Sequence, residues 1–138
     1  MYQALLIRYG EISLKGKNRS FFVHKLIENI KNALKETGPF RIEQSYGRIY
    51  LYIEGRPDQY IEKLKLIPGI VSVSPVAITE VNLEKIKDLA LGLFNYSVKT
   101  YPTSFKVETS RPNKDFPLKS PEISREVGAH LLKNINEN

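Results

Sequence analysis

The order of apolar segments and chain breaks in the first half of the chain is what most constrains the fold. Stretches of strand-like and helical periodicity alternate, and the changes coincide with glycine or proline at Gly38-Pro39, Pro57 and Pro68-Gly69. Two alternating stretches separated by a short turn are typical of a hairpin. The predicted elements are strands over 2–9, 40–45, 48–54 and 70–79, and helices that begin near residue 18 and near residue 57.

This β-α-β-β-α-β order is typical of a ferredoxin-like domain, in which two helices pack on one face of a sheet. We therefore predict an α+β ferredoxin-like domain at residues 1–79. Pro75 favours an edge position or a bend for the last strand. Tyr50 and Tyr52 share a strand face and would be able to stack on RNA bases if the face is open. An RNP-type signature is absent, and a tyrosine pair covered by a second domain fits the pattern better.

Residues 80–138 predict a second domain that starts with a helix and continues into a strand over 105–109. A basic loop follows, and then a second helix with Ser120 as N-cap and Pro121 at its first position. A parallel strand–helix unit needs a further strand to cover it, and none follows in this sequence. We therefore predict a truncated α/β domain with an exposed edge along 103–109.

Composition narrows the class of protein. Apolar residues make up 41% of the chain, but no run of 18 of them occurs, which argues against a membrane span. The N-terminus lacks a signal peptide pattern, and the absence of cysteine excludes disulfides and thiolate metal sites. A cytoplasmic protein is expected. The net charge of +6 favours a polyanionic partner.

The segment 110–125 is the stronger candidate for an RNA site. Basic residues flank a loop stiffened by two prolines, ahead of a helix N-terminus that offers free N–H groups. Such a loop suits a nucleic-acid end, because phosphates meet cations and an aromatic ring meets a base. Phe116 is equally well explained as a core residue. The candidate residues are Arg111, Lys114, Phe116, Lys119, Ser120 and Arg125.

A second basic segment, 8–19, leads into the first predicted helix, where Lys15, Lys17 and Arg19 would be able to hold a phosphate. A solvated loop capped by Asn18 and Glu11 explains the pattern better. The segment does not match the P-loop pattern, so ATP binding is not predicted here.

No arrangement of residues predicts catalysis or metal binding. His24 and His130 lack triad partners, and the acidic residues are scattered. Two alternatives to RNA binding stay open. One is a small ferredoxin-like acyl-phosphate hydrolase using the 10–19 loop, and the other is a non-catalytic interaction or oligomerisation module.

Two motifs, at residues 8–19 and 105–125, resemble the tRNA 4-thiouridine synthetases, the ThiI family of tRNA sulfurtransferases that is also linked to thiamine thiazole synthesis. The resemblance implies a ferredoxin-like domain followed by a THUMP RNA-binding domain, which together hold the tRNA acceptor end and its 3′ tail. It also implies a separate C-terminal domain that adenylates a uridine with ATP, and a persulfide cysteine that delivers sulfur.

The family's Ser-Gly-Gly loop and its cysteine are absent from this sequence. We therefore expect the chain to bind tRNA and to catalyse nothing by itself, with no cofactor of its own and ATP confined to the missing domain. For the full-length family, a cysteine desulfurase is the expected sulfur donor, and a homodimer is one expected assembly.

Overall fold

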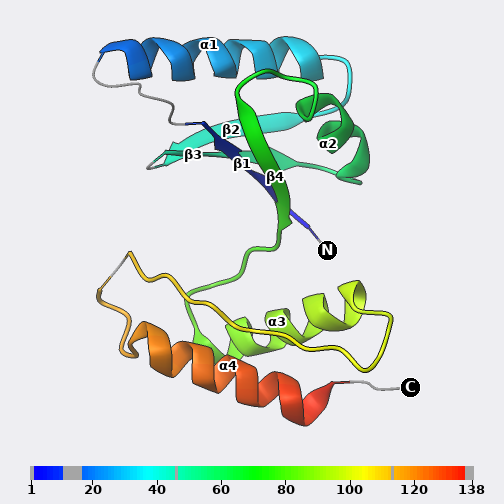
Figure 1. Ribbon diagram of the computed structural model, residues 1–138, viewed down its shortest axis with the longest axis vertical. Helices are drawn as coiled ribbons and strands as arrows, with labels where there is room; N and C mark the ends of the chain where they lie inside the picture. The colour runs from blue at the N-terminus through cyan, green and yellow to red at the C-terminus, as the bar shows by residue number, and fades with distance from the viewer. Residues whose placement is uncertain (1, 11–16, 46, 113, 136–138) are drawn as a thin grey trace. The chain divides into compact units, whose positions relative to one another are not determined.

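The computed structural model describes residues 2–10, 17–45, 47–112 and 114–135. The chain divides into two compact units, unit 1 (residues 1–78) and unit 2 (residues 79–138), each with its own apolar core (Figure 1). Lys15 lies outside the described residues.

Unit 1 has the predicted β-α-β-β-α-β order, and its sheet is antiparallel throughout with strand order β2-β3-β1-β4. The α+β, ferredoxin-like prediction is confirmed. Its elements are β1 (Ala4–Tyr9), α1 (Lys17–Leu34), β2 (Phe40–Ser45), β3 (Arg48–Ile53), α2 (Asp58–Leu64) and β4 (Ile70–Val76).

Both helices of unit 1 pack on the same face of the sheet. The apolar residues of α1 recur at helical spacing, and Leu26, Ile30 and Leu34 are all buried. They join Tyr60 and Leu64 of α2 in a single core. The strand residues of this core alternate along their strands and are Leu5, Ile7, Ile49, Leu51 and Ile53.

The intervening strand residues point to the opposite face of the sheet, which these helices leave uncovered. Tyr50 and Tyr52 lie there and are half-buried. The hint from Pro75 is confirmed, because β4 is an edge strand, where the missing N–H of proline costs no ladder hydrogen bond on the open side.

Unit 2 contains two helices, α3 (Leu83–Ser97) and α4 (Ser120–Asn134), among its described residues. Asn82 caps α3, since its Oδ1 accepts a hydrogen bond from the Lys85 N–H at 3.1 Å. Buried residues at helical spacing on α4 form the centre of the core. Residues from α3 and from the connecting segment pack around them, including Leu83, Ile86, Ala90, Phe94, Phe105, Val107 and Phe116.

The prediction of a strand over 105–109 is wrong, because the segment forms no ladder, but its side chains do alternate between the core and solvent as predicted. Phe105 and Val107 pack into the core, whereas Lys106 and Glu108 are exposed and pair with each other at 3.1 Å. A strand requires a partner for its ladder, and no described residue of unit 2 provides one. The segment instead packs along α4, where the hydroxyls of Thr109 and Ser124 hydrogen-bond at 2.7 Å.

The prediction of Ser120 as N-cap of α4 is also wrong, by one position. Lys119 is the N-cap residue, with φ −80° and ψ 160°, and Ser120 is already helical. Pro121, predicted at the first helical position, is the second residue of the helix and still lies in the first turn, where its missing N–H is not needed. Within the described ranges, no helix has the length and apolar character that crossing a membrane requires.

Candidate nucleic-acid interface

The guanidinium of Arg111 holds the loop between residues 111 and 119 in shape. Its Nη1 donates hydrogen bonds to the carbonyl oxygens of Lys114 and Phe116, each at 3.0 Å. The side chain is half-buried, and its Nε is buried without a hydrogen-bond partner among the described residues. The hydrogen bonds of Arg111 therefore serve to organise the loop.

Phe116 packs into the core of unit 2, against the cluster built on Ile123, Val127 and Leu131. Its ring is half-buried. Of the two interpretations that the sequence left open, the geometry supports the core residue. By fixing the loop onto α4, Phe116 determines where the neighbouring cations lie.

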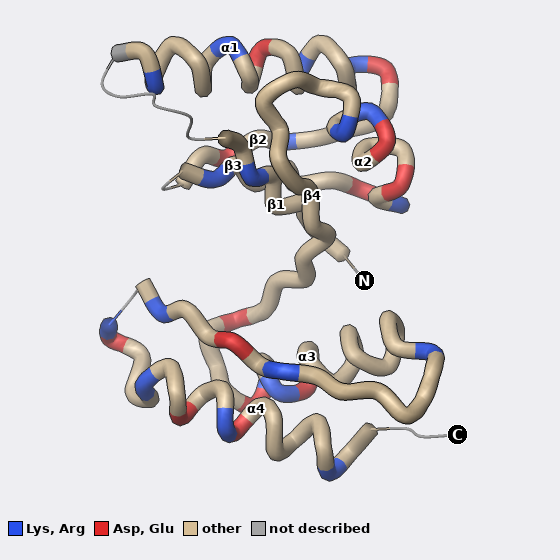
Figure 2. The backbone as a smooth tube through the Cα atoms, viewed as in Figure 1, with Lys and Arg blue, Asp and Glu red and all other residues tan. Residues whose placement is uncertain are grey.

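Three cations of this region are exposed: Lys114 in the loop, Lys119 at the N-cap and Arg125 in the second turn of α4. Ser120 is half-buried in the first helical turn. The side chain of the N-cap residue Lys119 makes no capping hydrogen bond at this end of α4, where the first N–H groups of a helix need partners from side chains, solvent or a ligand. Figure 2 shows lysine and arginine residues in the loop and along the start of α4, interspersed with acidic residues, and further lysines and arginines elsewhere in unit 2. The exposed cations would be able to bind phosphates, and the acidic residues between them reduce the repulsion of the cations for one another.

The second basic segment lies at the start of α1 in unit 1. Lys17 is the first residue of that helix, and Arg19 follows in its first turn. This turn holds no acidic residue, so the positive end of the helix dipole is reinforced rather than neutralised.

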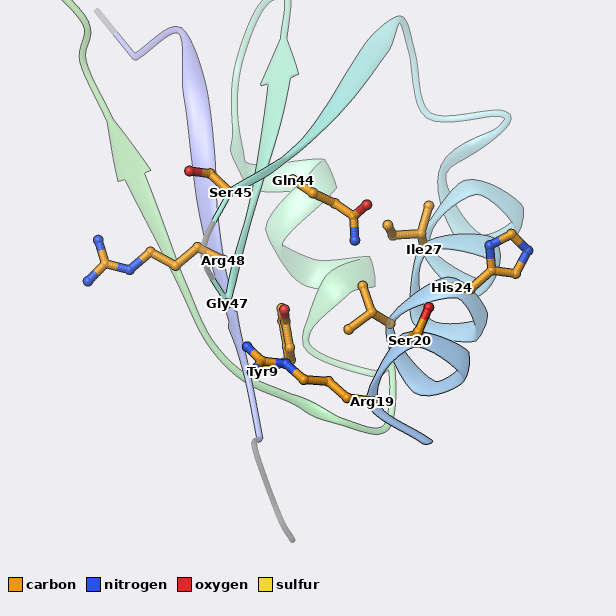
Figure 3. A pocket seen from close by; sticks show the side chains of 10 residues that line it. Tyr9, Arg19, Ser20, His24, Ile27, Gln44, Ser45, Gly47 and Arg48 are labelled. Atoms are coloured by element: carbon orange, nitrogen blue, oxygen red, sulfur yellow. The ribbon is translucent and has the colours of Figure 1, made fainter. Parts of the chain in front are cut away.

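A hollow of about 450 Å³ opens beside this helix start. Figure 3 shows Arg19 reaching past the ring of Tyr9, Gln44 pointing toward Ile27, and His24 pointing away from them. The residues that line it are Tyr9, Arg19, Ser20, Val23, His24, Ile27, Gln44, Ser45, Gly47 and Arg48. The sequence predicted Arg19 but missed the strand-end residues, whose only signal was their position where the strands end.

Neither the basic loop of unit 2 nor the start of α1 shows, among its described residues, a pair of side chains placed for acid–base catalysis. Within the part of the chain that is described, no three His, Cys, Asp or Glu side chains lie together as metal ligands. His130 approaches a carboxylate, with its Nε2 at 3.6 Å from Oδ1 of Asp88, but this contact joins α4 to α3 away from the basic loop. What the described residues of the two basic segments provide is a set of cations that can contact anions.

These features define a class of protein: an antiparallel ferredoxin-like domain followed by a domain with a basic loop at a helix start. The chain matches the ThiI ferredoxin-like domain over residues 4–74 and the THUMP domain over residues 80–138, and it belongs to the ThiI family.

Curated relatives are similar along almost the whole chain. Probable tRNA sulfurtransferases of Halothermothrix orenii and Thermoanaerobacter pseudethanolicus are 52% and 48% identical to it, over 99% and 98% of its length. The chain spans about a third of the length of these relatives (34% and 35%).

Two solved structures share the fold. A crystal structure of a protein from Pyrococcus horikoshii is 37% identical, with a TM-score of 0.82 over 97% of this chain and 45% of the other. A 4-thiouridine synthetase solved in complex with RNA and with bound ATP is 30% identical, with a TM-score of 0.84 over 98% of this chain and 34% of the other.

Proposed function

We propose that this chain is the tRNA-binding part of a tRNA 4-thiouridine synthetase and that it holds the acceptor stem and 3′ tail of its substrate. The observation that carries the proposal is the similarity to the 4-thiouridine synthetase–RNA complex, with a TM-score of 0.84 over 98% of the chain. The exposed cations of unit 2 supply the chemistry, because salt-dependent contacts to phosphate dominate the affinity of most RNA-binding proteins.

The residues have different roles in this proposal. Lys114, Lys119 and Arg125 contact phosphates, and the first N–H groups of α4, beside Ser120, offer further donors. Arg111 and Phe116 are positioning residues that shape the loop. At the start of α1, a second contact is proposed for Lys15, Lys17 and Arg19.

The test is the affinity of the 138-residue chain for tRNA, measured by filter binding across a salt series. We expect the double variant Lys114→Ala/Lys119→Ala to bind more weakly and to reduce the slope of log K against log salt by about 2, or roughly 1 for each phosphate contact. The matched control is Lys31→Ala/Lys133→Ala, which removes two exposed lysines from the last turns of α1 and α4.

An unchanged slope in the loop variant, or an equal loss in the control, would contradict the placement of the site. Absence of tRNA binding at low salt would overturn the proposed function as a whole.

The activity of the longer protein is a further proposal. We place ATP use and sulfur transfer in the part of the relatives that this chain does not span, with a cysteine desulfurase as sulfur donor and the cytoplasm as location. Calorimetry with ATP should then show no binding to this chain.

A second candidate, self-association into a homodimer, is favoured by one observation. In unit 2, Val81 and Leu132 are 78% and 74% exposed, and the extended 103–109 segment pairs with no strand among the described residues. Such apolar surface and such an edge invite association. Sedimentation equilibrium would show a dimer, and a monomer at all concentrations would exclude it.

A further inference from the structure

The uncovered face of the unit 1 sheet carries an ordered set of charged and aromatic side chains. Antiparallel register places its residues in three rows across the four strands, and directly opposed residues share a face. We call this surface the open face. Its rows are Arg41–Tyr52–Ala4–Val76, Glu43–Tyr50–Leu6–Ser74 and Ser45–Arg48–Arg8–Ser72.

Two arginines lie directly opposite each other on this face. Arg8 of β1 pairs in register with Arg48 of β3, and both side chains are exposed. Like charges directly opposed on neighbouring strands destabilise a sheet. The acid of the open face, Glu43, is engaged elsewhere, with its Oε2 at 3.2 Å from Nη1 of Arg41. Among the described residues, the Arg8 and Arg48 pair therefore lacks a carboxylate partner, and a bound anion would relieve its repulsion.

Neighbouring side chains hold Arg8 and Arg41 of the open face in place. Nη1 of Arg8 donates to the hydroxyl oxygens of Ser74 at 2.8 Å and Ser72 at 3.3 Å. The guanidinium carbon of Arg41 lies 4.0 Å from the ring centroid of Tyr52. Figure 3 shows the Arg48 side chain pointing away from α1. Cations that are held in position lose less conformational freedom when they bind a ligand.

The middle of the open face is aromatic. Tyr50 and Tyr52 are separated by one residue on β3, so both rings lie on the same side of the strand, and both are half-buried. Leu6 lies in register beside Tyr50 and is only 6% exposed, so the residue next to this ring is apolar and largely buried. Aromatic rings on an exposed sheet stack with unpaired bases in several RNA-binding modules.

We propose that the open face binds single-stranded RNA, with Tyr50 and Tyr52 stacking on bases and Arg8 and Arg48 contacting a phosphate. The proposal rests on the proposed RNA-binding function and adds a second contact surface to it. Charge decides in favour of a polyanion: three arginines and one glutamate lie in the three rows of this face, and two of the arginines oppose each other with no carboxylate partner in the described part of the chain.

The experiment uses a fluorescein-labelled uridine octamer as probe, with the 138-residue chain titrated in anisotropy and amide shifts mapped by NMR. We expect Tyr50→Leu/Tyr52→Leu to weaken octamer binding by about 25-fold or more, because each of the two base stacks contributes at least about fivefold. Arg48→Gln should weaken binding and lower the salt slope by about 0.7. The matched control is Arg56→Gln, an exposed arginine that follows β3 and lies off the open face.

The amide shifts keep the test decisive even if the tyrosine variant fails to fold. Shifts in β1, β3 and β4 support the proposal. Octamer shifts confined to loop 111–119, or unchanged affinity in Arg48→Gln, overturn it and leave the proposed function standing if tRNA still binds. Loss of all RNA binding by the unaltered chain overturns both, whereas octamer binding without tRNA binding overturns the proposed function alone.

Discussion

At the residue scale, Gly69 shows how one backbone position fixes the entry to β4. Its φ is +96°, and a Cβ built there would lie 2.9 Å from a ring carbon of Phe22 in α1. Gly69→Ala therefore combines an unfavourable dihedral with a clash against a core-packed ring. We expect it to lower the free energy of unfolding by about 2–4 kcal/mol, measured by urea denaturation.

Gly55→Ala is the matched control for this substitution. Its φ is similar, at +85°, but a Cβ there would meet no atom within 4 Å. This variant should pay only the dihedral cost of about 1–2 kcal/mol. Equal losses in the two variants would mean that Phe22 moves aside without cost.

The functions of single residues were less accessible from the sequence than their places in the fold. Arg111 fits an anion-binding pattern equally well whether its guanidinium faces solvent or two backbone carbonyls, and its bonds to Lys114 and Phe116 depend on how the loop folds back. Phe116 was undecided for the same reason. The opposed pair of Arg8 and Arg48 depends on strand register, which no short stretch of sequence reveals.

At the element scale, the spacing of apolar residues predicted the helices correctly, because local geometry alone determines a helix. The helices α1, α3 and α4 were found from apolar residues at helical spacing, because a helix satisfies its own backbone hydrogen bonds. The segment 105–109 has the alternation of a strand, yet no ladder forms among the described residues, because pairing depends on a partner elsewhere in the chain. The boundary at Ser120 moved by one residue, which is within the ordinary fraying of helix ends.

Lys87 joins the two helices of unit 2. Its Nζ lies 3.2 Å from a carboxylate oxygen of Glu126 on α4 and 3.4 Å from one of Glu84 on α3, and the side chain is 15% exposed. We expect Lys87→Met to lower the melting temperature of the chain. The control Lys85→Met removes a pair with Glu80 in which both side chains are more than half exposed, and it should have little effect.

The Lys87 pair also has a defined pH dependence. The hydrogen bond to Glu126 is the main cause that raises the pKa of Lys87 above its ordinary value of 10.5. A raised pKa in the folded state means that the contribution is complete below that value and is lost as pH rises through the folded pKa. Thermal melts at increasing alkaline pH should therefore converge for Lys87→Met and the unaltered chain, and a constant difference would contradict the pairing.

At the scale of the whole molecule, the positive charge is unevenly shared. Unit 1 holds 12 basic and 7 acidic residues, whereas unit 2 holds 9 and 8. Long-range attraction of a polyanion should come mainly from unit 1, because it depends on net charge. Unit 2 has little net charge, so its contribution to RNA affinity depends on where individual cations lie. This suits the proposed contact with one end of the tRNA.

This division predicts different effects of neutralising cations in the two units. The pair Arg8→Gln/Arg48→Gln and the pair Lys114→Ala/Lys119→Ala should each lower the salt slope for tRNA, because the first removes the proposed shared contact to one phosphate and the second removes two proposed phosphate contacts. Only the unit 2 pair should reduce the preference for intact tRNA over tRNA trimmed at its 3′ end, because loop 111–119 is the proposed contact with the tail.

The measurement is the ratio of the two affinities across a salt series, with Lys31→Ala/Lys133→Ala as control. If the unit 2 pair leaves that ratio unchanged, loop 111–119 does not contact the tail; if the unit 1 pair reduces it, unit 1 also takes part in end recognition.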